Sequence, residues 1–166
     1  MGVDPGLSGT GYGVVALRGA GRLEAVDFGV IRTRKGPEEL RLLRIFEALR
    51  ALIIDRRPEV LAIERVFYHR SFEAASQTGK VAGAAMLAAA ACGVPVAQYA
   101  PKEVKIAVTG HGGADKKQVA YMVRQILGLD DEPPEHASDA LALCICHLHL
   151  SSATFNGGLL KGGEGA

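Results

Sequence analysis

Three carboxylates lie at predicted strand ends or near a predicted helix start, where an acidic side chain can take part in catalysis or metal binding. Asp4 comes near the start of the chain, directly before the pair "PG". Glu64 closes the apolar run "VLAI", and Asp139 lies near the start of the last helical segment. An acid that follows an apolar strand is costly to bury without a partner. Because ligands of open α/β sheets gather outside the strand ends, Asp4 and Glu64 are expected to converge there if their strands are neighbours.

His136 joins this set, because it precedes Asp139 by three residues and so shares its helix face. Clustered carboxylates repel one another unless a hard cation neutralises them, and oxygen-rich sites suit Mg²⁺ or Mn²⁺ better than zinc. Two such ions, roughly 3.5–4 Å apart, serve in-line displacement at a phosphodiester. Each acid also has a plain alternative: Asp4 as a turn former, and Asp139 as a stabiliser of a helix N-terminus. Together they predict metal-dependent phosphodiester chemistry.

Basic residues gather in one stretch, residues 101–124, although the net charge of the whole chain is only +1. They are Lys102, Lys105, Lys116, Lys117 and Arg124. Such side chains are suited to phosphate contacts, which give affinity without reading bases. For Lys102 and Lys117, an ordinary solvated helix face is an equally open interpretation.

The segment "RVFYHRSF" directly follows Glu64 and places aromatic residues beside arginines. Phe67 and Tyr68, with Arg70 nearby, are candidates for stacking on an unpaired base close to the acidic site. For Tyr68 a structural role stays open as well. Phe72 is expected to begin the core of the next helix instead.

The elements that must position these residues follow from hydrophobic periodicity. Segments 12–17 and 23–33, with the opening "GVD", predict an antiparallel meander, and the run after Pro58 and the segment "VPVAQYA" predict two further strands. Helices are predicted over 37–57, 71–92, 102–108, 116–127 and from Pro134 through "HASDALALCICHLHL". Strands separated by long helices should be parallel crossovers. The order therefore predicts an α/β domain with a five-stranded mixed sheet flanked by helices.

Composition fits one globular domain, at 166 residues with 48% apolar and 22% charged residues. Residues 1–150 are predicted to form it, and the glycine- and serine-rich residues 151–166 to form a flexible tail. The three cysteines form no CxxC pair, which suits a reducing cytosol, and no signal peptide is recognisable. The alanine-rich run 81–97 is interrupted by two glycines and a proline, so it is expected to be a packed helix in a protein without membrane spans.

Four blocks together resemble the RuvC family of Holliday-junction resolvases: "GVDPGLSGTGYGVV", "LAIERVF", "APKEVKIAVTGHGGADKKQVAYMV" and "HASDALALCICH". The resemblance covers about residues 1–150. It implies an RNase H-like fold and a cytoplasmic homodimer that makes paired, symmetric, metal-dependent nicks in four-way junction DNA during recombination and repair. It also implies contact with the RuvA–RuvB branch-migration complex. Family members usually have a few more residues before the first aspartate. Either the natural start lies upstream, or the first strand is held by fewer hydrogen bonds.

Carried over by position, the resemblance implies that Asp4, Glu64 and Asp139 bind Mg²⁺, with Mn²⁺ also supporting activity, and with two ions per site. His136 stands where many members have an aspartate, so it is expected either to bind a metal or to act as a base towards water. Lys105 and Lys116 match positions close to the scissile phosphate, and Phe67 matches the stacking position.

Two other functions stay open: a related RNase H-like nuclease that acts on RNA or other branched DNA, and a junction-binding module without catalysis. The alanine-rich face of segment 71–92 permits close helix approach and is a candidate dimer interface. Gly9, Gly11 and Gly13 are expected to keep the second strand slim, which would let a phosphate backbone approach.

Overall fold

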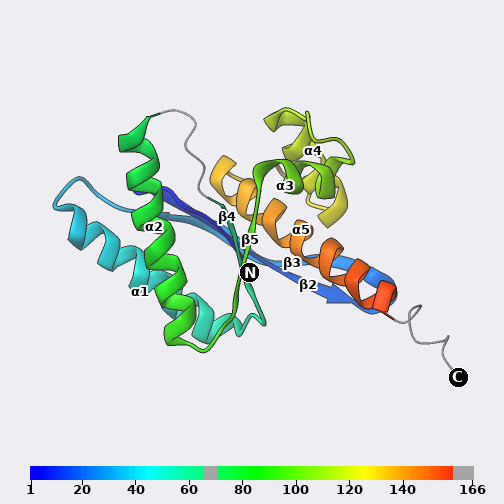
Figure 1. Ribbon diagram of the computed structural model, residues 1–166, viewed down its shortest axis with the longest axis horizontal. Coiled ribbons are helices and arrows are strands. Elements are labelled where there is room, and N and C mark those ends of the chain that lie inside the picture. Colours follow the sequence, from blue (N-terminus) through cyan, green and yellow to red (C-terminus); the bar gives the residue numbers. More distant parts are fainter. Residues whose placement is uncertain (66–70, 159–166) are drawn as a thin grey trace, which may run out of the picture.

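One mixed sheet organises the protein, seen here in a computed structural model that describes residues 1–65 and 71–158 (Figure 1). Its strands are β1 (Gly2–Asp4), β2 (Gly9–Arg18), β3 (Arg22–Arg32), β4 (Leu61–Glu64) and β5 (Val96–Tyr99), in the spatial order β3-β2-β1-β4-β5. The first three strands form the predicted antiparallel meander, and β1, β4 and β5 are parallel. The predicted RNase H-like fold, a five-stranded mixed sheet in an α/β domain, is confirmed.

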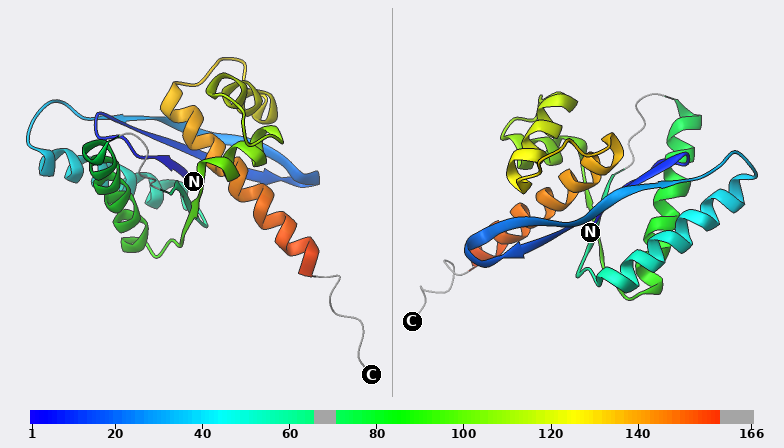
Figure 2. Two further views of the ribbon diagram at one scale, coloured as in Figure 1. Left: turned by 45° about the horizontal axis from the view of Figure 1, so that its top comes forward. Right: turned by 180° about the vertical axis from the view of Figure 1, so that it is seen from behind.

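Helices cover both faces of this sheet. They are α1 (Glu38–Arg56), α2 (Phe72–Ala91), α3 (Pro101–Thr109), α4 (Lys116–Leu127) and α5 (Glu135–Gly158). The views in Figures 1 and 2 show α1 and α2 together on one side of the sheet and α3, α4 and α5 on the other. A 3₁₀ turn, Gly19–Gly21, joins β2 to β3 at the end of their long hairpin.

Two hydrophobic clusters hold the layers together. Val3 of β1 and Ile63 of β4 face α1 and α2, whereas Ala62 faces the cluster of α3, α4 and α5. This division follows from the alternation of side chains along a strand. No helix of the described residues is long and apolar enough to cross a membrane.

The buried stripe of α1 differs from the predicted one. Among the apolar residues that recur at spacings of three and four along 37–57, the periodicity predicts Leu40 and Leu43 on the packed face, but their side chains are 58% and 49% exposed. Leu49 and Ile53, which belong to the same predicted pattern, are buried, and Ile45, which does not belong to it, is buried with them. The hydrophobic pattern was wide enough for two stripes, and the packing of α1 on the sheet and α2 selects one of them.

The last helix is longer than predicted. We expected it to end near residue 150, with a tail from 151 onwards, whereas α5 continues to Gly158. Residues 159–166 of the predicted tail lie outside the described residues. The first strand is short, as expected, but it is extended by Met1, whose ammonium donates to Val60 O and whose carbonyl accepts from Ala62 N.

Candidate active site

Asp4 and Glu64 end two neighbouring strands. In the parallel pair β1 and β4, Val3 lies opposite Ile63, so the next residues of both strands are the two acids. Because Val3 and Ile63 face α1 and α2, alternation turns both carboxylates towards α5. The structure thus brings these two predicted residues together, as expected for strands that are neighbours.

The first turns of α5 bring the other two residues of the set. His136 Nδ1 lies 2.7 Å from Asp4 Oδ2, across 132 positions of sequence. When the carboxylate accepts this hydrogen bond, Nδ1 is the donor, and Nε2 keeps the free lone pair of the ring. A carboxylate that holds one ring nitrogen while the other is free is the arrangement typical of histidines that bind metals or accept protons.

Close packing of α5 on β1 and β2 makes this meeting possible, and here the structure overturns an expectation. We expected the glycines of β2 to make room for a phosphate backbone. Instead, a Cβ added to Gly11 would collide with the backbone carbonyl of His136, and one added to Gly13 would lie 2.8 Å from Leu141 Cδ2. The glycines therefore admit α5, and they hold its first turns against the sheet edge.

The pKa values of two of these carboxyl groups, Glu64 and Asp4, are raised. The pKa of Glu64 is raised to about 6, mainly because the group is desolvated by burial and then because Asp4 and Asp139 lie nearby. Burial also raises the pKa of Asp4, although the hydrogen bond from His136 opposes the shift. Strongly perturbed acids in one place are typical of functional sites.

The raised pKa of Glu64 predicts a pH-dependent stability of the metal-free protein. Between about pH 4.5, where the unfolded carboxyl titrates, and about 6, the folded state holds a proton that the unfolded state has released. The free energy of unfolding therefore falls as pH rises through this window. With a discount for its partial exposure, we expect a loss of about 1 kcal/mol from this group.

Urea unfolding from pH 4 to pH 7.5 in the presence of a chelator measures this loss. The matched control is Glu64→Gln, which cannot ionise and should lack this component of the pH dependence while keeping that of the other acids. Identical profiles for the two proteins would contradict the assignment of the shift to Glu64.

Two of the predicted lysines stand close to these acids. Lys105 of α3 and Lys116 of α4 both lower the pKa of Glu64 through their charge, which opposes the larger effect of burial. Lys116 Nζ also lies 3.2 Å from Asp139 Oδ2. The structure therefore brings both lysines to the acidic edge, as their predicted role near a scissile phosphate requires.

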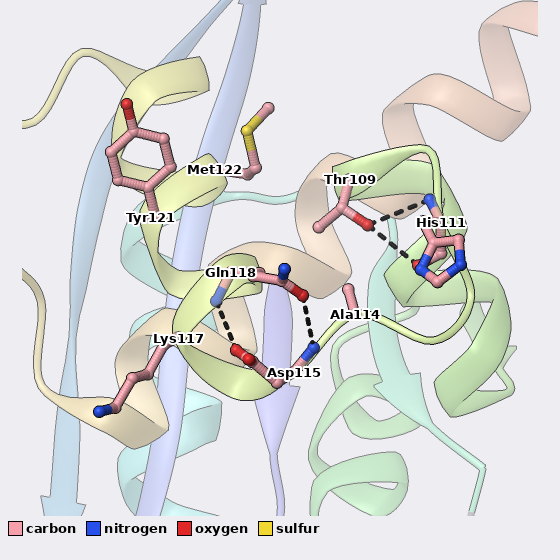
Figure 3. Close-up of a pocket in the computed structure, with 8 residues that line it drawn as sticks. All are labelled: Thr109, His111, Ala114, Asp115, Lys117, Gln118, Tyr121 and Met122. Atoms are coloured by element: carbon pink, nitrogen blue, oxygen red, sulfur yellow. Dashed lines mark hydrogen bonds between the residues drawn. The ribbon is translucent and has the colours of Figure 1, made fainter.

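The start of α4 fixes where its lysines point. Asp115 caps the helix: its carboxylate accepts from Gln118 N at 2.9 Å, while the Gln118 side chain accepts from Asp115 N (Figure 3). Lys117 follows within the first turn and extends away from Thr109 and His111. These capping residues line a surface hollow of about 530 Å³ beside α4.

The remaining basic residues differ in how available they are. Lys102 and Lys117 are exposed, so both keep their predicted choice between phosphate contact and a solvated face. Arg124 is engaged: its guanidinium donates to Leu129 O and Asp130 O and thereby holds the chain that leaves α4. The guanidinium of Arg124 therefore has a structural role in this loop.

The predicted stacking residues cannot be placed. Phe67, Tyr68 and Arg70 lie outside the described residues. Phe72 is described, and its predicted place in the helix core is wrong: it is the first residue of α2, and it is 75% exposed. The helix begins there because Ser71 Oγ accepts a hydrogen bond from Ala74 N and so caps the helix.

Sequence reasoning missed two features of the site. Glu135, the first residue of α5, lies 2.6 Å from Lys116 Nζ, and nothing in their separation of 19 residues signals the pair. Arg41 of α1 donates to Thr33 Oγ1 and Ser8 Oγ, and so ties the loop after Asp4 to the helix layer. Both depend on tertiary packing alone.

The donor set suits a hard divalent cation, since three carboxylates and an imidazole converge with too little positive charge. Among the described residues, however, no three His, Cys, Asp or Glu side chains are already arranged to hold a metal ion. Asp4 is hydrogen-bonded to His136 and Asp139 to Lys116, and a cation would compete with both partners. The residues fit such an ion by their chemistry, and binding would require them to exchange partners.

Known proteins resemble this chain in sequence and in fold. The sequence profile described as "Crossover junction endodeoxyribonuclease RuvC" matches residues 1–147. A protein of that name from Syntrophomonas wolfei is 45% identical over 151 residues, which cover 90% of this chain and 87% of the relative. The structure described as Thermus thermophilus RuvC in complex with Holliday junction substrate is 40% identical and superposes with a TM-score of 0.87, over 92% of this chain and 94% of that one.

A more distant structure shares only the fold. The yeast mitochondrial Holliday junction resolvase is 10% identical, with a TM-score of 0.68 over 93% of this chain and 81% of the other. The profile match and the identity over nine-tenths of the chain decide the assignment, and they agree with four sequence blocks whose acidic residues the fold gathers at one sheet edge. The chain belongs to the RuvC family of crossover junction endodeoxyribonucleases.

Proposed function

We propose that the protein is a structure-selective endonuclease that resolves four-way DNA junctions in homologous recombination and repair. The observation that carries this proposal is the meeting of Asp4, Glu64 and the start of α5 at one sheet edge, beside the lysines of α3 and α4. Acids that need a cation, next to ammonium groups suited to phosphate, are what phosphodiester hydrolysis requires. Membership of a family of crossover junction endodeoxyribonucleases supports the choice of a junction as substrate.

The family's nucleases depend on divalent metals. For this chain we propose Mg²⁺, with Mn²⁺ as a substitute and two ions per site, held by Asp4, Glu64, Asp139 and His136. When bound, such ions lower the pKa of the attacking water and neutralise charge on the leaving oxygen. His136 is either a ligand through Nε2 or the group that accepts a proton from the water, since Nδ1 is held by Asp4.

The basic residues have separate roles in this proposal. Lys105 and Lys116 stand at the acidic edge, where their charge would stabilise the phosphoryl oxygens in the transition state. Lys102 and Lys117 are exposed on α3 and α4 and would contact phosphates of the arms. Stacking of Phe67 or Tyr68 on an unpaired base, with Arg70 on the backbone, stays a prediction about residues that the structure does not describe.

Two symmetric cuts require two active sites, so we propose a homodimer. The alanine-rich face of α2 is not free for this purpose: Val81, Ala85 and Ala89 are buried within the chain against α1 and the sheet. Phe72 and Leu87 of α2 are exposed and are better candidates for the interface. We propose that the dimer acts on chromosomal junctions in the cytoplasm. There it would contact a RuvA–RuvB branch-migration complex.

A synthetic junction with homologous arms tests this function. With Mg²⁺ we expect paired nicks at symmetric positions, and no comparable cutting of a linear duplex of the same sequence. Cleavage of RNA in preference to the junction would favour the related-nuclease alternative. Tight junction binding without nicking in either Mg²⁺ or Mn²⁺ would favour the non-catalytic alternative.

A further inference from the structure

Lys116 is held between two carboxylates at the start of α5. Its Nζ lies 2.6 Å from Glu135 Oε1 and 3.2 Å from Asp139 Oδ2. The shorter contact is with Glu135, and this hydrogen bond is the largest of the influences that raise the pKa of Lys116. A side chain proposed to meet a phosphate is therefore already occupied in the protein without DNA.

Glu135 has no place among the predicted metal-binding acids. It is the first residue of α5, and its side chain is 71% exposed, whereas that of Asp139 is 32% exposed. Its carboxylate extends towards the N-terminal turn of α4, from which Lys116 comes. Its ion pair with Lys116 is the contact through which it can act on the phosphate in the proposed mechanism.

The surroundings explain why the contact matters. Lys116 and Lys117 share a hollow of about 310 Å³ with three carboxylates, Glu132, Glu135 and Asp139. Acidic groups outnumber basic ones there, so the hollow attracts an ammonium and repels a phosphate. A DNA phosphate that approaches Lys116 must displace Glu135 as its partner and also overcome the repulsion from the released carboxylate.

We propose that Glu135 is a positioning residue that restrains Lys116 in the DNA-free protein and yields it to a phosphate when DNA binds. The inference rests on the proposed function, in which Lys116 meets the DNA backbone. The contact of Lys116 with phosphate then forms only when DNA is bound, because the ammonium exchanges Glu135 for a phosphate. Until a DNA backbone enters the hollow, Glu135 keeps Lys116 from binding other anions.

Binding without metal tests the restraint, because no cleavage then interferes. Fluorescence anisotropy with a labelled junction in a chelator, over a range of salt concentrations, gives Kd and its salt dependence. For Glu135→Gln we expect about two- to fivefold tighter binding, the scale of one exposed ion pair. The slope of log K against log salt should steepen, by up to about 0.9, because the carboxylate that the parent protein releases takes up a cation and so offsets one counterion lost from the DNA.

Two controls separate the restraint from a general loss of negative charge. Glu132→Gln removes the same charge from the same hollow, but Glu132 has no ion pair with Lys116 among the described residues. This variant should change Kd less and leave the slope unchanged. In a Lys116→Gln background, Glu135→Gln should have no effect on the slope, because its partner is gone.

The proposal is overturned if Glu135→Gln binds DNA as the parent protein does, if Glu132→Gln steepens the salt slope as much as Glu135→Gln, or if the effect of Glu135→Gln persists without Lys116. The same series is measured on a linear duplex, where any phosphate backbone can replace Glu135. Failure of the protein to cleave junctions would refute the proposed function. The restraint of Lys116 by Glu135 would still be tested by the duplex binding data.

Discussion

Asp4→Asn is expected to abolish junction cleavage while leaving junction binding intact. The change keeps the shape of a side chain that is largely buried at the end of β1, but it removes the charge that a cation needs. It also replaces one acceptor oxygen by an amide donor, which cannot accept from His136 Nδ1 at that position. We expect the single-turnover rate with Mg²⁺ to fall on the order of a thousandfold, as when one group that stabilises transition-state charge is lost.

Binding should survive because the affinity for DNA comes from lysines on α3 and α4, not from the acids. Removal of one negative charge beside Lys116 should leave Kd unchanged or slightly lower it. Asp55→Asn is the matched control: the same chemical change on α1, at a side chain that is 66% exposed and pairs only with Arg56 among the described residues. Cleavage by Asp4→Asn at the parent rate would refute the assignment of the site.

The acidic edge could be predicted from sequence because it depends on local rules. Each strand ends in a carboxylate, alternation sets the face on which it lies, and parallel neighbours end at one edge. These local rules do not show that β1 and β4 are adjacent. That information came from the resemblance of the sequence blocks to a known family. Asp139 and His136 followed from helix periodicity in the same way.

Features that depend on contacts between distant elements could not be predicted. The pairing of Lys116 with Glu135 needs the relative position of α4 and α5, and the stripe of α1 depends on which of two apolar faces meets the sheet. The β2 glycines are the clearest case. Sequence shows that small residues are needed there, but not whether the neighbour is a phosphate or a helix.

This difference has a large expected consequence at Gly11. In the pairing of β1 with β2, Gly11 lies opposite Asp4, and α5 crosses directly above it. A methyl group added there would fall far inside van der Waals contact of the His136 carbonyl, which is backbone and cannot rotate away. Gly11→Ala should therefore push the first turn of α5 off the sheet and cost about 3 kcal/mol of folding free energy.

Urea unfolding of Gly11→Ala should show a lower midpoint with an unchanged slope. The fraction that remains folded should cleave junctions poorly, since His136 and Asp139 move with the helix turn. Gly19→Ala is the control: it adds the same methyl group at the far end of the β2–β3 hairpin. Apart from Gly19 and its two chain neighbours, no atom of the described residues would lie within 4 Å of the added Cβ, so stability should change by less than about 1 kcal/mol. If β2 were slim for a phosphate instead, Gly11→Ala would fold with parental stability and weaken only DNA binding. The two explanations of the glycines therefore differ in which measurement changes, and the close approach of α5 favours a loss of stability.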